Sequence, residues 1–138
     1  SRLFARRAFN IDSLAVGETD RHDTSSMTIV SNGDQRTIDQ IEKHLNKRID
    51  VIKVRRLEEK QCIQQEMMLI KIAYNQSNRG SLIELCQIMH AEILHLSPKH
   101  VIVEIHSTSE TLNEFVEMVR PYGISEIQRT GTIAIGKH

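Results

Sequence analysis

Tryptophan is absent from this 138-residue chain, and aromatic side chains are scarce, with three phenylalanines and two tyrosines. Proteins that read single-stranded nucleic acid stack bases on such rings, so the scarcity argues against that function. Basic and acidic residues are equal in number, 18 of each, so no global field would hold nucleic acid or an anionic membrane. No apolar run approaches the roughly 20 residues of a membrane-spanning helix.

Cysteine is also rare. The two thiols, Cys62 and Cys86, are far apart and form no Cys-x-x-Cys pair, which argues against a disulfide scaffold or a zinc ribbon and favours a reducing compartment. The remaining composition predicts a globular chain with one medium domain or two very small ones. The chain starts at Ser1, inside a helical pattern and without methionine, so we expect the protein's N-terminus to lie upstream.

Motifs of enzymatic catalysis are missing as well. The sequence has no His-Glu-x-x-His pattern, no nucleophile beside a histidine and a carboxylate, and no glycine-rich phosphate loop, since Gly33 alone indicates a turn. We therefore expect no catalytic residues on this chain.

Four histidines in the second half raise the hypothesis of a metal site: His90, His95, His100 and His106. With Pro98 and Lys99 at a turn, however, His95 would pair opposite Ile102 rather than His106. The imidazoles would then not converge, so we expect strand histidines and no metal site.

The first half of the chain alternates between helical and strand patterns. A helical pattern ends at Asn10, where a strand over residues 11–17 begins, and a second strand is predicted at residues 27–30. A helix is predicted from Gln35, then a strand at residues 49–54, and the charged residues 55–61 indicate a linker. Asn10 at the junction has two interpretations: it fixes the polar end of a small ligand, or it satisfies local backbone at a turn.

The second half predicts the order strand, helix, strand, strand, helix, strand. Its first strand, residues 67–73, is a nearly continuous apolar run, which is typical of burial on both faces. Capping-box patterns place the two helix starts at Ser81 and Ser107. Leu112, Phe115, Val116 and Val119 form one stripe of the second helix.

The two halves repeat one unit, and the first copy lacks its opening strand. The repeat predicts an α+β protein of two tandem ferredoxin-like (βαββαβ) domains, residues 1–58 and residues 59–138. Because the opening strand lies in the middle of such a sheet, its loss would leave many backbone groups unpaired. We therefore expect about 15–20 further residues upstream, or a strand supplied by another chain.

Several stretches, taken in order, resemble one family. Residues 4–17 (FARRAFNIDSLAVG) and 25–30 (SSMTIV) are similar to the N-terminal ACT domain of the acetolactate synthase (acetohydroxyacid synthase) small subunits. The pattern continues in the same order through residues 33–34, 38–47, 50–54, 68–72, 121–124 and 129–131. The resemblance thus covers essentially the whole chain.

This resemblance implies a regulatory subunit of branched-chain amino acid biosynthesis that pairs as a homodimer through its ACT domains. It implies that the chain binds a branched-chain amino acid, usually valine, for feedback inhibition, and that it activates a separate catalytic subunit. That partner would carry thiamine diphosphate, magnesium and FAD, whereas this chain would carry no cofactor and bind no nucleic acid or membrane. The expected location is a bacterial cytoplasm or a plastid stroma.

The family's effector site carries over to two residues. Asn10 is expected to hydrogen-bond the charged groups of the ligand, and Gly17 is expected to leave room near the paired interface. The family's other effector-binding segment, a glycine-containing loop after the first strand, is absent from this sequence. The resemblance therefore defines half of the site.

The sequence departs from the family pattern at several positions. Ala8 and Ser107 replace glycines, Ser26 replaces an arginine, Gln64 and Gln65 replace Glu-Arg, and Met89 and His90 replace Phe-Arg. The methyl group of Ala8 would crowd the ligand loop, and the lost arginines would remove ion pairs to the catalytic subunit. Regulation is therefore expected to be weaker, or tuned to another amino acid.

Two other functions suit the same topology. RNA-recognition domains share the βαββαβ order, but they need aromatic side chains on their central strands, where this chain has Ile, Leu, Val and Met. Apolar open sheet faces suit burial by a protein partner instead. The second alternative is a free-standing amino-acid sensor with tandem ACT-like domains and no enzyme partner.

Overall fold

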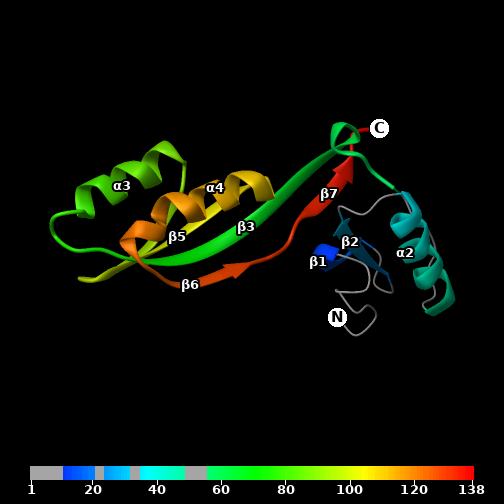
Figure 1. Cartoon of the computed structure of the whole chain (residues 1–138), viewed down its shortest axis with the longest axis horizontal. Helices are drawn as coiled ribbons and strands as arrows, with labels where there is room; N and C mark the ends of the chain where they lie inside the picture. Colours follow the sequence, from blue (N-terminus) through cyan, green and yellow to red (C-terminus); the bar gives the residue numbers. More distant parts are fainter. Residues whose placement is uncertain (1–10, 21–23, 32–34, 49–55) are drawn as a thin grey trace. The chain divides into compact units, whose positions relative to one another are not determined.

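The computed structural model describes residues 11–20, 24–31, 35–48 and 56–138 (Figure 1). The chain divides into two compact units, one of Ser1–Ile63 with Ala134–His138 and one of Gln64–Ile133. The helix predicted before Asn10, Asn10 itself and the strand predicted at residues 49–54 lie outside the described residues. Within the described residues, no helix is both long enough and apolar enough to cross a membrane.

The first unit contains a β-hairpin and a helix. Strands β1 (Ile11–Glu18) and β2 (Ser25–Ser31) pair antiparallel, and helix α2 (Gln35–Arg48) follows, as the periodicity predicts. On α2, the side chain of Ile41 is buried. A short 3-10 helix, η1 (Glu59–Gln61), occupies the end of the predicted linker.

The second unit is a βαββαβ domain. Its elements are β3 (Cys62–Ala73), α3 (Arg79–Ile88), β4 (Glu92–Leu96), β5 (His100–Ser107), α4 (Ser109–Val119), the 3-10 turn η2 (Arg120–Tyr122) and β6 (Ile124–Arg129). The strand order is β4-β5-β3-β6, and β7 (Ile133–Gly136) also pairs with β3. The first strand of this unit thus lies between its third and fourth, as the ferredoxin-like fold requires. Helices α3 and α4 lie on one face of the sheet (Figure 1).

The core of the second unit lies between that face and the two helices. Its most deeply buried strand residues alternate along β3 and β5, and the predicted stripe of α4 supplies the opposite side. The buried residues are Met68, Ile70, Ile72, Leu82, Cys86, Val101, Val103, Ile105, Leu112, Phe115, Val116 and Val119. Burial raises the pKa of the Cys86 thiol, as expected for a small core residue.

The apolar run of β3 is buried on one face only, so the prediction of burial on both faces was wrong. Met68, Ile70 and Ile72 are almost fully buried, whereas Met67 and Leu69 are 44% and 39% exposed. Helices cover a single face of this antiparallel sheet, and the other face is left open, as is common in such sheets.

Both helix starts predicted from capping boxes also differ from the structure. Helix α3 begins at Arg79, two residues before Ser81, because the Asn75 side chain accepts hydrogen bonds from the backbone N–H groups of Ser77 and Asn78 (both 2.9 Å) and shapes the turn. The N-cap of α4 is Thr108 rather than the predicted Ser107, and the Thr108 hydroxyl accepts a hydrogen bond from the Thr111 N–H (3.3 Å).

Helix α3 ends in a Schellman motif. The N–H of Ala91 donates to the carbonyl of Cys86 (2.8 Å), and the N–H of His90 donates to the carbonyl of Gln87 (3.2 Å). This arrangement gives His90 a φ of 58°, in the left-handed region that glycine adopts more easily.

Candidate functional site

The β1–β2 hairpin carries Gly17, one of the two predicted effector residues. Gly17 is exposed and pairs directly with Ser26, where the family pattern has an arginine. A Cβ built on Gly17 meets none of the described residues within 4 Å, and its φ is not positive. The part of the chain that the structure describes therefore gives no steric reason for glycine here.

The other predicted effector residue, Asn10, lies outside the described residues, so its role stays a prediction. It precedes Ile11, the first residue of β1, and the register places Ile11 opposite Ser31. Gly17 lies near the other end of the same strand, followed by a connection in which the Thr19 N–H donates to the Thr24 carbonyl (3.3 Å).

Arg56 binds two carboxylates on helix α2. Arg56 donates through Nε to Glu42 Oε2 (2.8 Å) and through Nη2 to Asp39. The hydrogen bond from Arg56 holds the pKa of Asp39 below its usual range, and the carboxylates of Glu42 and Asp39 raise the pKa of Arg56. All three side chains are about one-third exposed or more, so the cluster ties Arg56 to α2 without burying charge.

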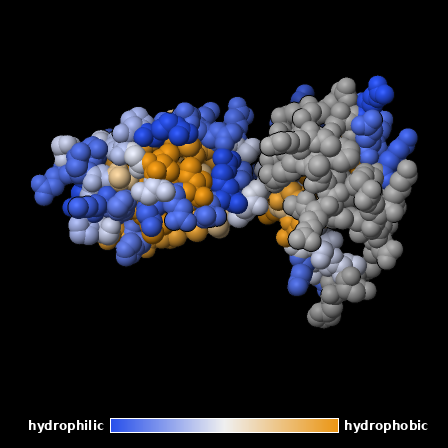
Figure 2. Space-filling model, turned by 60° about the horizontal axis from the view of Figure 1, so that its bottom comes forward, coloured by the Kyte–Doolittle hydropathy of each residue, from blue (hydrophilic) through white to orange (hydrophobic). Residues whose placement is uncertain are grey.

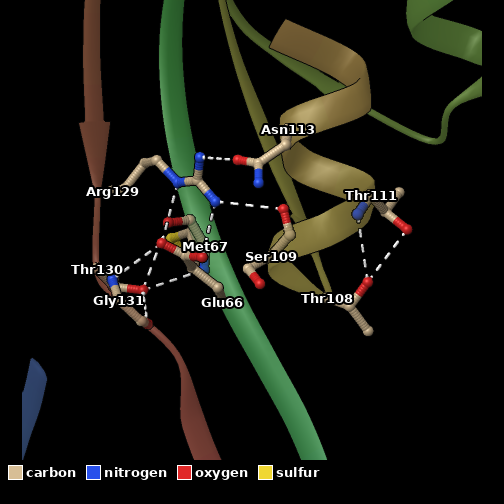
Figure 3. Close-up of polar contacts among 9 residues, drawn as sticks. All are labelled: Glu66, Met67, Thr108, Ser109, Thr111, Asn113, Arg129, Thr130 and Gly131. Carbon is tan, nitrogen blue, oxygen red and sulfur yellow. Dashed lines mark hydrogen bonds and ion pairs between the residues drawn. The ribbon is translucent and has the colours of Figure 1, made fainter. Parts of the chain in front are cut away.

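A buried carboxylate organises one end of the second unit. Glu66 on β3 is only 5% exposed and accepts two hydrogen bonds from Arg129, at 3.0 Å from Nε and 2.9 Å from Nη2 (Figure 3). The backbone N–H of Gly131 donates a third bond to Glu66 Oε2 (3.1 Å). Such a bidentate pair with a satisfied carboxylate is a strong, directional contact.

The same guanidinium reaches helix α4. Arg129 Nη1 donates to Asn113 Oδ1 (2.6 Å) and Nη2 donates to the carbonyl of Ser109 (3.4 Å), so β3, β6 and α4 meet at one side chain (Figure 3). Thr130 continues the contact with β3, since its N–H donates to the Met67 carbonyl (3.0 Å). These donors are occupied within the domain, which indicates a structural role for Arg129.

Motif analysis did not single out Glu66 or Asn113. In the sequence, Glu66 is a single carboxylate directly before an apolar strand. If that strand is central, the carboxylate becomes buried and needs a hydrogen-bonding partner. The positions Gln64 and Gln65, where the family has Glu-Arg, lie just before it on β3, half-buried and exposed respectively.

The four histidines do not converge on one point, although His95 and His100 both lie beside the β4–β5 turn. His95 pairs with Ile102, as predicted, and His106 Nδ1 lies 2.9 Å from Glu104 Oε1 on its own strand. Among the described residues, no three His, Cys, Asp or Glu side chains are placed to hold a metal ion.

The helix-free face of the sheet presents apolar side chains to solvent. Figure 2 shows an apolar area on the second unit with hydrophilic surface around it. On this face, β3 contributes Met67, Leu69 and Lys71, of which Met67 and Leu69 are exposed. Their register partners are His106, Glu104 and Ile102 on β5 and Gln128 and Glu126 on β6. No phenylalanine, tyrosine or tryptophan lies among these positions, and such a mixed face suits contact with a protein better than stacking of bases.

Comparison with known proteins gives matches for both halves of the chain. Residues 65–138 match the family model described as the small subunit of acetolactate synthase, and residues 1–53 match the AHAS small subunit-like ACT domain. The chain is 40% identical over 136 residues to the probable acetolactate synthase small subunit of Methanothermobacter thermautotrophicus, covering 98% of this chain and 81% of that protein. It is 39% identical over 137 residues to the acetolactate synthase small subunit of Mycolicibacterium smegmatis, covering 99% and 81%.

A solved structure agrees with these matches. The crystal structure of the acetolactate synthase small subunit from Thermotoga maritima superposes with a TM-score of 0.87 at 32% identity, covering 99% of this chain and 86% of that one. The fold and the paired matches define a protein of two tandem ferredoxin-like domains, the first an ACT domain. The chain belongs to the acetolactate synthase small subunit family.

Proposed function

We propose that this chain activates the thiamine-diphosphate-dependent catalytic subunit of acetolactate synthase and makes it sensitive to valine or another branched-chain amino acid. The observation that carries the proposal is the match of both halves of the chain, in order, to the small-subunit family. In this proposal residues 1–58 form the effector-binding ACT domain, and residues 59–138 form the C-terminal domain.

The effector site is proposed at the interface between the ACT domains of two copies. Gly17 supports this placement because nothing described within the chain calls for a glycine there: its Cβ position is open and its φ is not positive. A glycine without an internal reason is expected where a second chain or a ligand approaches the backbone. Asn10 would bind the ligand's charged groups.

The partner and location follow from the same proposal. The catalytic subunit would carry thiamine diphosphate, magnesium and FAD, and this chain would contribute no cofactor and no catalytic residue. The two proteins would meet in a bacterial cytoplasm or a plastid stroma, compartments that keep Cys62 and Cys86 reduced.

The direct test is acetolactate formation by the cognate catalytic subunit, with and without the full-length version of this chain, while valine is titrated. We expect the rate to rise when this chain is added and to fall again as valine increases. No change in rate would contradict the proposal and favour a free-standing amino-acid sensor, which would also fail to co-purify with the catalytic subunit.

Two glycine variants separate the effector site from general effects. We expect Gly17→Ala to leave activation intact and to weaken valine inhibition by roughly tenfold in concentration, since a clash of about 1.4 kcal/mol has that effect. Gly80→Ala is the matched control, because its Cβ position is equally open but lies on α3 of the other domain. Equal valine sensitivity of both variants would argue against Gly17, and Asn10→Ala then tests the site independently.

A further inference from the structure

A shallow hollow lies on the helix-free face of the second unit, beside the β4–β5 turn. Its volume is about 360 Å³, and it is open to solvent. The lining side chains come from four strands and the turn: Lys71, His95, Ser97, His100, Ile102 and Ser125. All belong to the second unit, so the hollow is complete within one domain.

Most of the polar groups around this hollow are unused. Within the described residues, the side chains of Lys71, His95, His100 and Ser125 make no hydrogen bond and no ion pair. Lys71 is nevertheless half-buried between its register partners on β5 and β6. An ammonium group, two imidazoles and a hydroxyl therefore surround one space with free donors.

The turn between His95 and His100 is held in place by hydrogen bonds. Ser97 Oγ donates to the carbonyl of His100 (3.1 Å) and accepts from the His100 N–H (3.2 Å). The Tyr74 hydroxyl donates to the Ser97 carbonyl, and the Tyr74 N–H donates to the Lys99 carbonyl (3.0 Å). A fixed turn keeps His95 and His100 near Lys71 before any ligand arrives, which lowers the entropic cost of binding.

Carboxylates on the same face do not line the hollow. Glu104 lies 2.9 Å from His106 Nδ1, and Glu126 accepts a hydrogen bond from Gln128 (3.4 Å). Glu126 is the register partner of Lys71 on β6, yet the two form no ion pair in the structure. Lys71 is thus left to interact with an anion in the hollow.

We propose that this hollow binds a phosphate group, either as free phosphate or as part of a small phosphorylated molecule. A phosphate offers several oxygens in different directions, which matches donors that approach from four strands better than a planar carboxylate does. The volume leaves room for a small organic group beside the phosphate. This site is separate from the effector site proposed on the β1–β2 hairpin and does not depend on it.

The test is a titration of the ¹⁵N-labelled full chain, followed by amide chemical shifts at constant ionic strength. Inorganic phosphate and glycerol 3-phosphate are the probes, with acetate and chloride as controls. We expect both probes to give saturable shifts confined to the lining residues. Tighter binding of glycerol 3-phosphate would assign the site to a phosphorylated small molecule, and equal binding would assign it to phosphate itself. Acetate binding as tight as phosphate binding, absence of saturation, or shifts spread over the surface would overturn the proposal.

Substitutions of single side chains test which of them contribute to phosphate binding. We expect Lys71→Gln to weaken phosphate binding by about tenfold or more, because a charge-assisted hydrogen bond is lost. Lys99→Gln is the matched control, since this lysine lies on the turn outside the lining and should leave the affinity unchanged. If Lys71→Gln perturbs the spectrum of the free domain, Ser125→Ala provides a second test with a smaller loss. Equal affinity of the Lys71 and Lys99 variants would exclude the site.

Discussion

Each of the two units of the chain is stabilised internally in a different way. In the second unit, a set of apolar side chains from β3, β5, α3 and α4 is nearly inaccessible to water. Among the described residues of the first unit, only Ile41 and Cys62 are buried apolar side chains. The comparison indicates that the second unit is stabilised by its own core, whereas the first is proposed to complete its structure through pairing with a second copy.

Their ion pairs differ in the same way. The Glu66–Arg129 pair joins three elements around an almost fully buried carboxylate, whereas the Arg56 cluster on α2 is largely solvated. Identical chemistry therefore contributes differently in the two units, because water screens the exposed cluster and leaves the buried carboxylate dependent on its partners.

The largest expected effect tests the core of the second unit. Phe115 is fully buried, so Phe115→Ala should lower the free energy of unfolding of this unit by about 3–5 kcal/mol through lost burial and a cavity. Met118→Ala is the control on the same helix, because that side chain is 44% exposed and should cost less than about 1 kcal/mol. Urea unfolding followed by circular dichroism measures both, and similar midpoints for the two variants would refute the comparison.

The buried carboxylate comes next. Glu66→Gln keeps the shape of the side chain but weakens both bonds from Arg129 and leaves that cation unpaired, so we expect a loss of about 1–3 kcal/mol. The exposed pair Glu117–Arg120 on α4 provides the control, since Glu117→Gln should change stability by less than about 1 kcal/mol. A larger loss for Glu117→Gln than for Glu66→Gln would show that burial does not decide the contribution.

Periodicity was sufficient to predict most of the described fold. Alternation of apolar and polar residues predicted the two strands of the β1–β2 hairpin, and the apolar stripe of α4 predicted the face that this helix buries. The similarity of the two halves predicted the βαββαβ order, which the strand pairing of the second unit confirms. The helix starts were wrong by one or two residues because Asn75 shapes the turn just before α3 through the N–H groups of Ser77 and Asn78, and Thr108 rather than Ser107 caps α4. Several nearby residues can make such local bonds, and their competition depends on three-dimensional geometry.

The sites were less accessible to sequence reasoning. The change of period at Asn10 left two interpretations open, ligand binding or a local turn, and the effector role of both Asn10 and Gly17 came from the family resemblance. Glu66 and Arg129 are 63 positions apart, so their contact depends on strand register. The hollow around Lys71 likewise needs residues from four strands. Long-range juxtapositions of this kind are absent from local periodicity.

A smaller effect of opposite sign is expected at the end of α3. His90, the residue after the C-cap Met89, has a φ of 58°, where glycine avoids the steric cost of a Cβ. His90→Gly should therefore raise the free energy of unfolding of the second unit by about 0.5–1 kcal/mol. Gly80→Ala, inside the same helix, should stabilise by a similar amount for the opposite reason, because its backbone is helical. A destabilised His90→Gly would mean that the imidazole makes a contact that outweighs the strain.

The smallest effect concerns the exposed cluster of the first unit. Arg56 lowers the pKa of Asp39, so Arg56→Gln should raise that pKa toward its ordinary value, as measured by NMR titration of the carboxyl group. Since the pKa of Asp39 is depressed in the folded state, the stabilisation from this pair is present above the unfolded pKa of about 4 and is lost as pH falls through the folded pKa.

Arg120→Gln is the control in the second unit: it should raise the pKa of Glu117, which Arg120 lowers, and leave the pKa of Asp39 unchanged. We expect neither variant to shift the urea midpoint measurably at neutral pH, because solvent screens both pairs; a clear shift for Arg56→Gln alone would place the stability of the first unit in its ion pairs rather than in its pairing with a second copy.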